Sequence, residues 1–271
     1  MRQILATVAL CLLAVPAIAA GDGPQSLNTA DEVRGLEGVG RLDMLTTSGQ
    51  SGFCTATLVS PTLVLTAAHC VFDPATGAAH RTEEIVFRAG LRHGREDARR
   101  TIRRMVVHPG YDFSAKPSAE SVAADLALLE LDRALQMPNV QPFPASGRLR
   151  EGDVVQVVSY ARDRADAPSS EDDCTVLHRN LRVLALDCSV NFGASGAPVF
   201  VNTTDGLRIV SVISAMGEID GEPAAFAVTV EAGLATLMQE FGRSSRLTAT
   251  RKTIRVGESA SGNIRFVRPG E

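Results

Sequence analysis

The feature that most constrains the fold is a succession of short apolar runs, rich in valine, isoleucine and leucine and separated by turn-forming residues. Such runs, without regularly alternating helical segments, are typical of an all-β barrel or sandwich. The runs are Thr57–Val59, Leu63–Thr66, Glu84–Arg88, Ile102–Val107, Leu126–Leu131, Val154–Tyr160, Leu181–Leu186, Ala197–Val201, Leu207–Ile213 and Ala225–Val230.

The stretch Pro138–Gly147 carries three prolines and a glycine and separates two groups of these runs. Segments of this composition are typical of domain boundaries. We therefore expect two β domains, an N-terminal one over residues 38–140 and a C-terminal one over residues 141–242.

Residues 1–20 have the pattern of a secretory signal peptide. Arg2 precedes an apolar run, Ile4–Ala14, and the segment ends in small residues at Ala17–Ala20. This run is shorter than the roughly 20 residues that a spanning helix needs, so a cleaved signal is favoured over a membrane span. The mature protein is expected to be secreted or periplasmic.

Both ends of the mature chain are weakly patterned. The polar residues 21–37 are interpreted as a flexible leader or a short pro-segment. Apolar residues at helical spacing in Glu231–Phe241 predict a closing helix, with Gly242 as its C-terminal stop. Two alternatives stay open for the polar tail 243–271: a disordered segment, or an extra strand through Thr253–Val256.

The cysteine count favours disulfides. Cys11 lies within the signal peptide, and an even set of cysteines remains in the mature chain: Cys54, Cys70, Cys174 and Cys188. Such a set in an exported protein favours disulfides over metal ligands, and no CxxC or HExxH spacing supports zinc. Of the three pairings, local spacing favours Cys54 with Cys70 and Cys174 with Cys188.

Charge gives no lead to function. The net charge of -4 comes from 27 basic and 31 acidic residues, and this balance does not indicate a nucleic-acid partner or a membrane surface. One basic cluster is interrupted by Glu96 and Asp97 and is interpreted as a solvated face, with an anionic-ligand patch as the alternative. Its members are Arg92, Arg95, Arg99, Arg100, Arg103 and Arg104.

Three segments carry residues that together suit acyl transfer, which needs a hydroxyl nucleophile, a base of near-neutral pKa and a carboxylate that orients the base. His69 stands in TAAHC after an apolar run, and Asp125 stands in ADLALL at the start of another. Ser195 lies in the glycine-rich turn GASGAP.

The order of these residues along the chain separates rival folds. In an α/β-hydrolase the histidine follows the nucleophile, but the last histidine here, His178, precedes Ser195. A subtilisin-like order would need an acid ahead of His69, and none of the candidates lies in a β-rich apolar context: Asp22, Asp31 and Asp43.

The three segments resemble those around the catalytic His, Asp and Ser of chymotrypsin-like serine proteases, and they occur in that family's order. TAAHC with its partner Cys54 is the most specific, and supporting matches extend from Gly52 to Val230, including VHPGYD upstream of Asp125. The resemblance is to a bacterial-type secreted member. It implies an all-β fold of two packed antiparallel barrels with a short C-terminal helix.

The resemblance also implies roles for individual residues. Ser195 would be the nucleophile, His69 the general base and then acid, and Asp125 the buried group that orients the histidine. Backbone amides of Gly193 and Ser195 would form the oxyanion hole. Ser214 matches a serine that often hydrogen-bonds the aspartate, and it begins the substrate-pairing strand Ser214-Ala215-Met216. The other histidines are interpreted as surface or structural residues: His80, His93, His108 and His178.

The sequence departs from the digestive members of the family at two positions. Ala194 replaces the Asp that pairs with a newly cut N-terminal ammonium, so we expect activity that does not depend on a buried new N-terminus. Ser189 stands at the base of the specificity pocket, where it lacks the charge that selects Lys or Arg. A small or apolar residue is therefore expected before the scissile bond. A register shift would bring Asp187 there and restore a basic preference.

These observations predict a serine-type endopeptidase that hydrolyses protein or peptide substrates through an acyl-enzyme, as a monomer and without a cofactor or metal. The alternative is a chymotrypsin-fold protein that binds peptides without turnover, motivated by Ala194 and the unusual pocket. The acidic residues between Asp73 and Glu84 are too sparse to argue for calcium.

Overall fold

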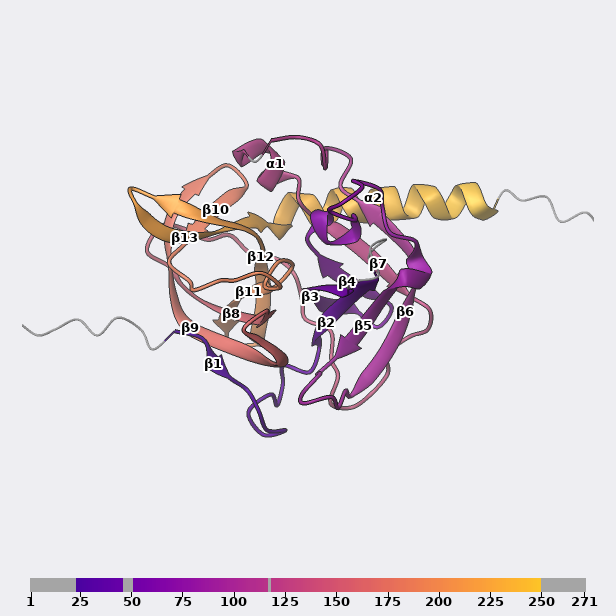
Figure 1. The fold of residues 1–271 in the computed structure, drawn as a ribbon, viewed down its shortest axis with the longest axis horizontal. Helices are drawn as coiled ribbons and strands as arrows, with labels where there is room; N and C mark the ends of the chain where they lie inside the picture. Colours follow the sequence, from indigo (N-terminus) through magenta and orange to yellow (C-terminus); the bar gives the residue numbers. More distant parts are fainter. Residues whose placement is uncertain (1–22, 46–50, 117, 250–271) are drawn as a thin grey trace, which may run out of the picture.

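The computed structural model describes residues 23–45, 51–116 and 118–249. Its first half is a closed antiparallel barrel with the strand order β2-β3-β4-β7-β6-β5 (Figure 1). The barrel closes because β2 pairs with β3 on one side and with β5 on the other. Its strands are β2 (Val39–Leu45), β3 (Ser51–Ser60), β4 (Leu63–Thr66), β5 (Ile85–Ala89), β6 (Ala98–Val107) and β7 (Ala127–Leu131).

The second half is an antiparallel sheet with the order β1-β9-β10-β13-β12-β11-β8, and β8 also pairs with β9, so this sheet closes on itself. The predicted fold of two packed β-barrels is confirmed. The strands are β1 (Gln25–Ser26), β8 (Val154–Ala161), β9 (Arg164–Asn180), β10 (Val183–Leu186), β11 (Pro198–Thr203), β12 (Gly206–Ile219) and β13 (Glu222–Thr229).

A hydrophobic layer joins the two barrels. In β4, Leu63 and Leu65 belong to this layer, whereas Val64 points into the first barrel. Phe143, in the segment between β7 and β8, and Phe200 of β11 also belong to this layer. Their ring centroids lie 4.7 Å apart. A strand that is buried on both faces has no polar alternation, which explains why β4 and β7 are apolar except for Thr66 and Glu130.

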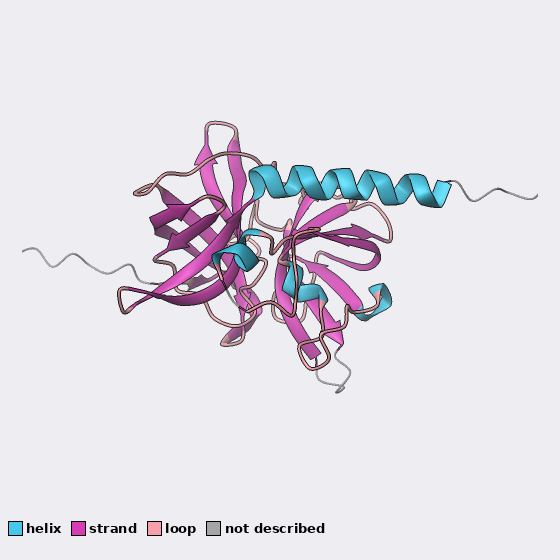
Figure 2. Cartoon of the chain, turned by 90° about the horizontal axis from the view of Figure 1, so that it is seen from above, coloured by secondary structure: helices cyan, strands magenta, loops and turns pink. Residues whose placement is uncertain are grey.

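Four helical segments complete the described part: η1 (Ala68–Val71), η2 (Thr82–Glu84), α1 (Ala119–Ala123) and α2 (Val230–Ala249). In Figures 1 and 2, α2 leaves the second sheet and runs across the first barrel. Its residue Leu237 is fully buried in the layer between the barrels. No helix among the described residues is long and apolar enough to cross a membrane.

The predicted end of the closing helix is wrong, because α2 continues through Gly242 to Ala249. A glycine stops a helix by adopting a positive φ, and Gly242 instead keeps the helical conformation. Tertiary contacts hold this turn. The guanidinium of Arg104 lies 3.5 Å from the ring centroid of Phe241, and its Nη1 donates to the Phe241 carbonyl at 3.2 Å.

The segment predicted to be a flexible leader is packed against the body from residue 23 onward. Strand β1 pairs with β9, with Gln25 opposite Ser170, and the side chains of Val33 and Leu36 are buried. Two apolar positions and one short pairing therefore anchor a stretch that is otherwise polar. The predicted signal peptide 1–20 and the tail from residue 250 lie outside the described residues.

The two predicted disulfides are confirmed, one in each barrel. Cys54–Cys70 ties β3 to the turn after β4, and Cys174–Cys188 ties β9 to the segment after β10. Each closes a short loop, with sequence separations of 16 and 14 residues.

Candidate active site

Two neighbouring strands bring His69 and Asp125 together. In the antiparallel pair of β4 and β7, Thr66 is opposite Ala127, so the residues just after β4 and just before β7 meet at one end of the barrel. Helix α1 delivers Asp125 to this point, because the Asp125 amide donates to the Val122 carbonyl at 3.0 Å.

The carboxylate of Asp125 holds the histidine at two places. Its Oδ1 accepts the backbone amide of His69 at 2.8 Å, and its Oδ2 lies 2.7 Å from the ring Nδ1. A carboxylate only accepts hydrogen bonds, so Nδ1 carries the proton and Nε2 is left as the basic atom. The ring is therefore oriented to take a proton at Nε2.

The second barrel completes the shell of Asp125. Ser214 of β12 donates its hydroxyl to Oδ2 at 2.5 Å, and Asp125 is only 4% exposed. Three donors from both barrels thus compensate the buried carboxylate. Tyr111 lies nearby, and burial, followed by the charges of Asp125 and Asp112, raises the pKa of its phenol, so Tyr111 stays protonated beside the site.

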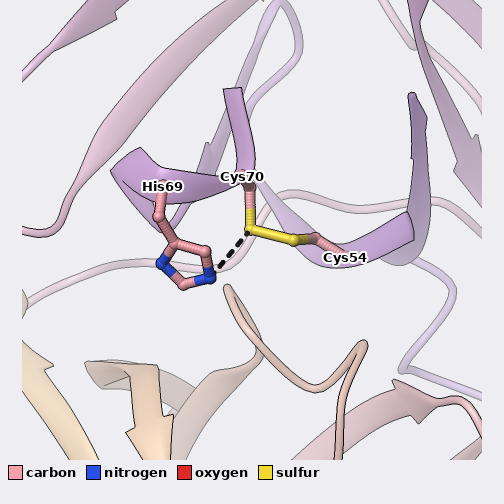
Figure 3. Close-up of side chains that lie close together, drawn as sticks. All are labelled: Cys54, His69 and Cys70. Carbon is pink, nitrogen blue, oxygen red and sulfur yellow. Dashed lines mark hydrogen bonds between the residues drawn. A yellow bond between two sulfur atoms is a disulfide. The ribbon is translucent and has the colours of Figure 1, made fainter. Parts of the chain in front are cut away.

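A disulfide packs against the histidine on its other side. Figure 3 shows the His69 ring beside the Cys54–Cys70 bridge, with Nε2 3.8 Å from Sγ of Cys70. This sulfur limits the rotation of the ring, because it occupies the space next to Nε2. The bridge therefore supports the position of His69 as well as the stability of the barrel.

The turn that carries Ser195 requires glycine on both sides. Gly193 and Gly196 have φ values of 98° and 81°, a region that favours glycine. A Cβ at Gly193 would also lie 2.3 Å from Phe53, and one at Gly196 would lie 2.1 Å from the Thr55 carbonyl oxygen. Close approach to the first barrel, together with backbone conformation, therefore fixes both glycines.

Ser195, His69 and Gly193 line one cavity of about 310 Å³. Among the described residues, the amides of Gly193 and Ser195 donate to no protein acceptor. Two amides without a protein acceptor are available to bind an oxyanion.

Aromatic side chains form much of this cavity, which we call the disulfide-side cavity. Phe72 and Phe113 stack with ring centroids 5.2 Å apart. The guanidinium carbon of Arg162 lies 4.7 Å from the ring centroid of Phe192, which is exposed. His80, which is only 5% exposed, also lines it. The lining residues include no carboxylate.

A second cavity of about 370 Å³ lies on the side of the predicted substrate-pairing strand. It is lined by Ala215 and Met216 of β12, together with Phe226 of β13 and residues of α1 such as Val122. The structure therefore places predicted substrate-binding residues in a cavity that is separate from the disulfide-side cavity.

The predicted pocket base is not part of either cavity. Ser189 is exposed, and its amide donates to the carboxylate of Glu171 at 2.8 Å. Burial raises the pKa of Glu171. Asp187, the alternative pocket acid, is exposed and accepts the Thr175 amide at 2.5 Å. Neither residue supports a charged pocket beside Ser195.

Three residues that adjoin the site were not predicted to be part of it. Thr55 packs on the turn of residues 193–196 that carries Ser195, which we call the nucleophile turn. Phe192 and His80 line the disulfide-side cavity. Thr55 directly follows Cys54, and that proximity was the available signal. His80, which was interpreted as a surface or structural residue, follows Ala78 and Ala79 and stands in no recognisable motif.

Two groups of side chains have spacing that suits a metal ion: Cys54, His69 and Cys70, and Glu171, Cys174 and Cys188. In each group the two cysteines are bonded to each other. A sulfur in a disulfide is not the thiolate that zinc binds. These groups therefore do not make metal sites in the oxidised protein.

The fold is that of the chymotrypsin-like serine proteases. A thermostable serine protease, AL20, from an extremophilic microorganism superposes with a TM-score of 0.61 at 18% identity, over 78% of this chain and 97% of that one. At this identity the likeness concerns the fold alone.

Sequence comparison defines the family. A family model described as Trypsin matches residues 41–233, so the chain belongs to the trypsin family of serine proteases. The Modular serine protease of Drosophila melanogaster is 34% identical over 93 residues, which cover 32% of this chain and 14% of that protein. The matched region is therefore a small part of that relative's length.

Proposed function

We propose that this protein is an exported serine endopeptidase that uses Ser195, His69 and Asp125. The observation that carries the proposal is the pair of hydrogen bonds from His69 to Asp125, which leaves Nε2 basic in the cavity that Ser195 also lines. Membership of the trypsin family supports the same chemistry.

In this mechanism Oγ of Ser195 attacks the scissile carbonyl carbon while its proton passes to Nε2 of His69. The carbonyl oxygen becomes an oxyanion, which accepts hydrogen bonds from the amides of Gly193 and Ser195. His69 then gives its proton to the leaving amine, the C–N bond breaks, and an acyl-enzyme forms. Water, activated by His69, releases the acid and restores Ser195.

The substrate chain before the scissile bond would pair with Ser214-Ala215-Met216. Because Ser189 and Asp187 offer no charge beside Ser195, we propose a small or apolar residue at the position before the cleaved bond. Two disulfides support an oxidising compartment outside the cytoplasm as the place of action.

The test is the intact mass of the mature protein after treatment with a fluorophosphonate, beside Ser195→Ala and His69→Ala. We expect one adduct on the wild type and none on either variant. Casein turnover by the wild type, abolished in Ser195→Ala, separates a peptidase from a protein that only binds peptides. An unlabelled wild type with intact disulfides would contradict the proposal.

A further inference from the structure

The nucleophile turn is held from the first barrel by one residue, Thr55 of β3. Thr55 is 0% exposed. Its amide donates to the Ser195 carbonyl at 2.8 Å, and its own carbonyl accepts the Thr66 hydroxyl at 2.8 Å. The backbone of Thr55 is therefore bonded to the turn on one side and to β4 on the other.

The hydroxyl of Thr55 makes a second bond to the same turn. Its Oγ1 donates to the Gly193 carbonyl at 3.0 Å and accepts the Tyr160 amide at 3.0 Å. The Tyr160 carbonyl also lies 3.4 Å from Oγ1, but a hydroxyl has a single proton, and the Gly193 carbonyl is closer. The side chain thus links β3, β8 and the nucleophile turn.

These bonds fix the peptides on both sides of the Ser195 amide. The Gly193 carbonyl belongs to the peptide before Ala194, and the Ser195 carbonyl belongs to the peptide before Gly196. Thr55 binds both oxygens. Because a peptide is planar, anchoring its carbonyl also sets the direction of its amide and limits the rotation of the peptide between the two anchors.

The remaining oxyanion donor is set in the same way. The Phe192 carbonyl, in the peptide that carries the Gly193 amide, accepts the Arg162 amide at 2.7 Å. Residue 194 contributes only backbone bonds, because Ala194 is buried and has no polar side chain. No ion pair through residue 194 can therefore order this turn.

We propose that Thr55 is a positioning residue that orients the Ser195 amide of the oxyanion hole, so that the turn needs no acidic side chain at position 194. This inference rests on the proposed function. It predicts that the hydroxyl of Thr55 contributes to the rate of acylation more than to substrate binding.

The same strand provides a matched control. Thr57, two residues further along β3, is also buried, at 1% exposed, and its hydroxyl has no hydrogen-bond partner among the described residues. Replacing either threonine by valine keeps the shape and removes one hydroxyl. The two variants therefore differ in whether the bond to the nucleophile turn and the bond from the Tyr160 amide are lost.

The experiment compares Thr55→Val, Thr55→Ser and Thr57→Val with the wild type, using kcat and KM for a chromogenic peptide anilide. We expect Thr55→Val to lower kcat about 10- to 100-fold, less than direct loss of an oxyanion donor, with KM changed by less than about twofold. Thr55→Ser should recover most of kcat, and Thr57→Val should match the wild type.

A second readout separates positioning from a merely structural role. Affinity for a peptide aldehyde, which forms a tetrahedral adduct with the serine, should fall with kcat/KM, while affinity for the product peptide stays the same. If Thr55→Val fails to fold, Thr55→Ala carries the same expectation.

Two results would overturn the inference alone: wild-type kcat in a folded Thr55→Val, or equal losses of aldehyde and product affinity. A wild type that neither turns over the anilide nor reacts with a fluorophosphonate would overturn the proposed function and this inference together.

Discussion

In the first barrel, His69 and Asp125 are hydrogen-bonded directly to each other, whereas Ser195 lies on a turn of the second barrel that is held from both barrels. The Gly196 amide donates to the Ile213 carbonyl within the second barrel, and Thr55 binds the turn from the first barrel. In return, Ser214 of the second barrel donates to Asp125. The acid–base pair is therefore built within one barrel, while the position of the nucleophile also depends on how the two barrels dock.

Removing the charge of Asp125 should break the first-barrel half of the site. In Asp125→Asn the side chain can present an amide to Nδ1, which favours the wrong histidine tautomer. We expect kcat to fall by about 10⁴-fold, as in other triads of this kind. Steady-state kinetics on a peptide anilide would measure this.

The matched control for that variant is Asp112→Asn. Asp112 is exposed, and its carboxylate accepts hydrogen bonds only from Ser114 among the described residues, so kcat should stay within about twofold of the wild type. Retention of a tenth or more of the activity in Asp125→Asn would contradict the assigned role.

The two disulfides offer a direct comparison of the barrels. Replacing either pair by alanine should lower the free energy of unfolding by about 3 kcal/mol, because the closed loops have nearly the same length. Only loss of Cys54–Cys70 should also lower kcat several-fold, since its sulfur packs against His69. Urea unfolding would measure the loss of stability, and steady-state kinetics at urea concentrations below the unfolding transition would measure kcat. Equal effects on kcat would show that the sulfur does not support the ring.

Ser214 tests the contact that the second barrel makes to the first. Ser214→Ala leaves the buried Asp125 carboxylate with one donor fewer, and a hydrogen bond to a charged group contributes about 1.5–3 kcal/mol. We expect a loss of about tenfold or more in kcat. The control is Ser211→Ala on the same strand, whose hydroxyl donates to the Val228 carbonyl at 2.7 Å. It should lower stability but leave kcat unchanged, and equal kcat losses would contradict the role of Ser214.

The same comparison explains which parts of the fold were predictable. Strands such as β4 and β7 were found because burial on both faces makes them almost entirely apolar. Strand β9 was missed because its sequence is largely polar and includes Pro168, although β8, β10 and β1 supply its pairing partners. Tertiary pairing, which local sequence does not encode, decides such a strand.

The residues of the site also differ in whether the sequence could predict them. His69, Asp125 and Ser195 were predicted because each stands in a recognisable segment. In the structure, Asp125 is hydrogen-bonded to His69, and Ser195 lines the same cavity as His69. The position of Ser189 was not predictable, because it depends on how the segment after β10 folds against Glu171. Thr55 was missed for a related reason: its importance arises from packing between barrels.

The smallest expected effect concerns histidines that lie outside the site, one in each barrel. His108 follows β6, is 7% exposed, and accepts the Gly110 amide at Nδ1 at 3.2 Å, while its Nε2 has no partner among the described residues. Burial, and then the charge of Arg182, lowers the pKa of His108 from 6.5. His178 is largely exposed, with Nδ1 2.8 Å from Glu151.

A histidine whose folded pKa is lowered binds fewer protons in the folded protein than in the unfolded chain, so stability falls as the pH drops below 6.5. Between pH 7 and pH 5 we therefore expect His108 to lower the free energy of unfolding. His108→Asn, which keeps an acceptor for Gly110, should flatten this part of the profile, whereas His178→Asn should leave that contribution in place. Urea midpoints at the two pH values would measure it. A profile that His108→Asn does not change would mean that the pH dependence arises from other groups.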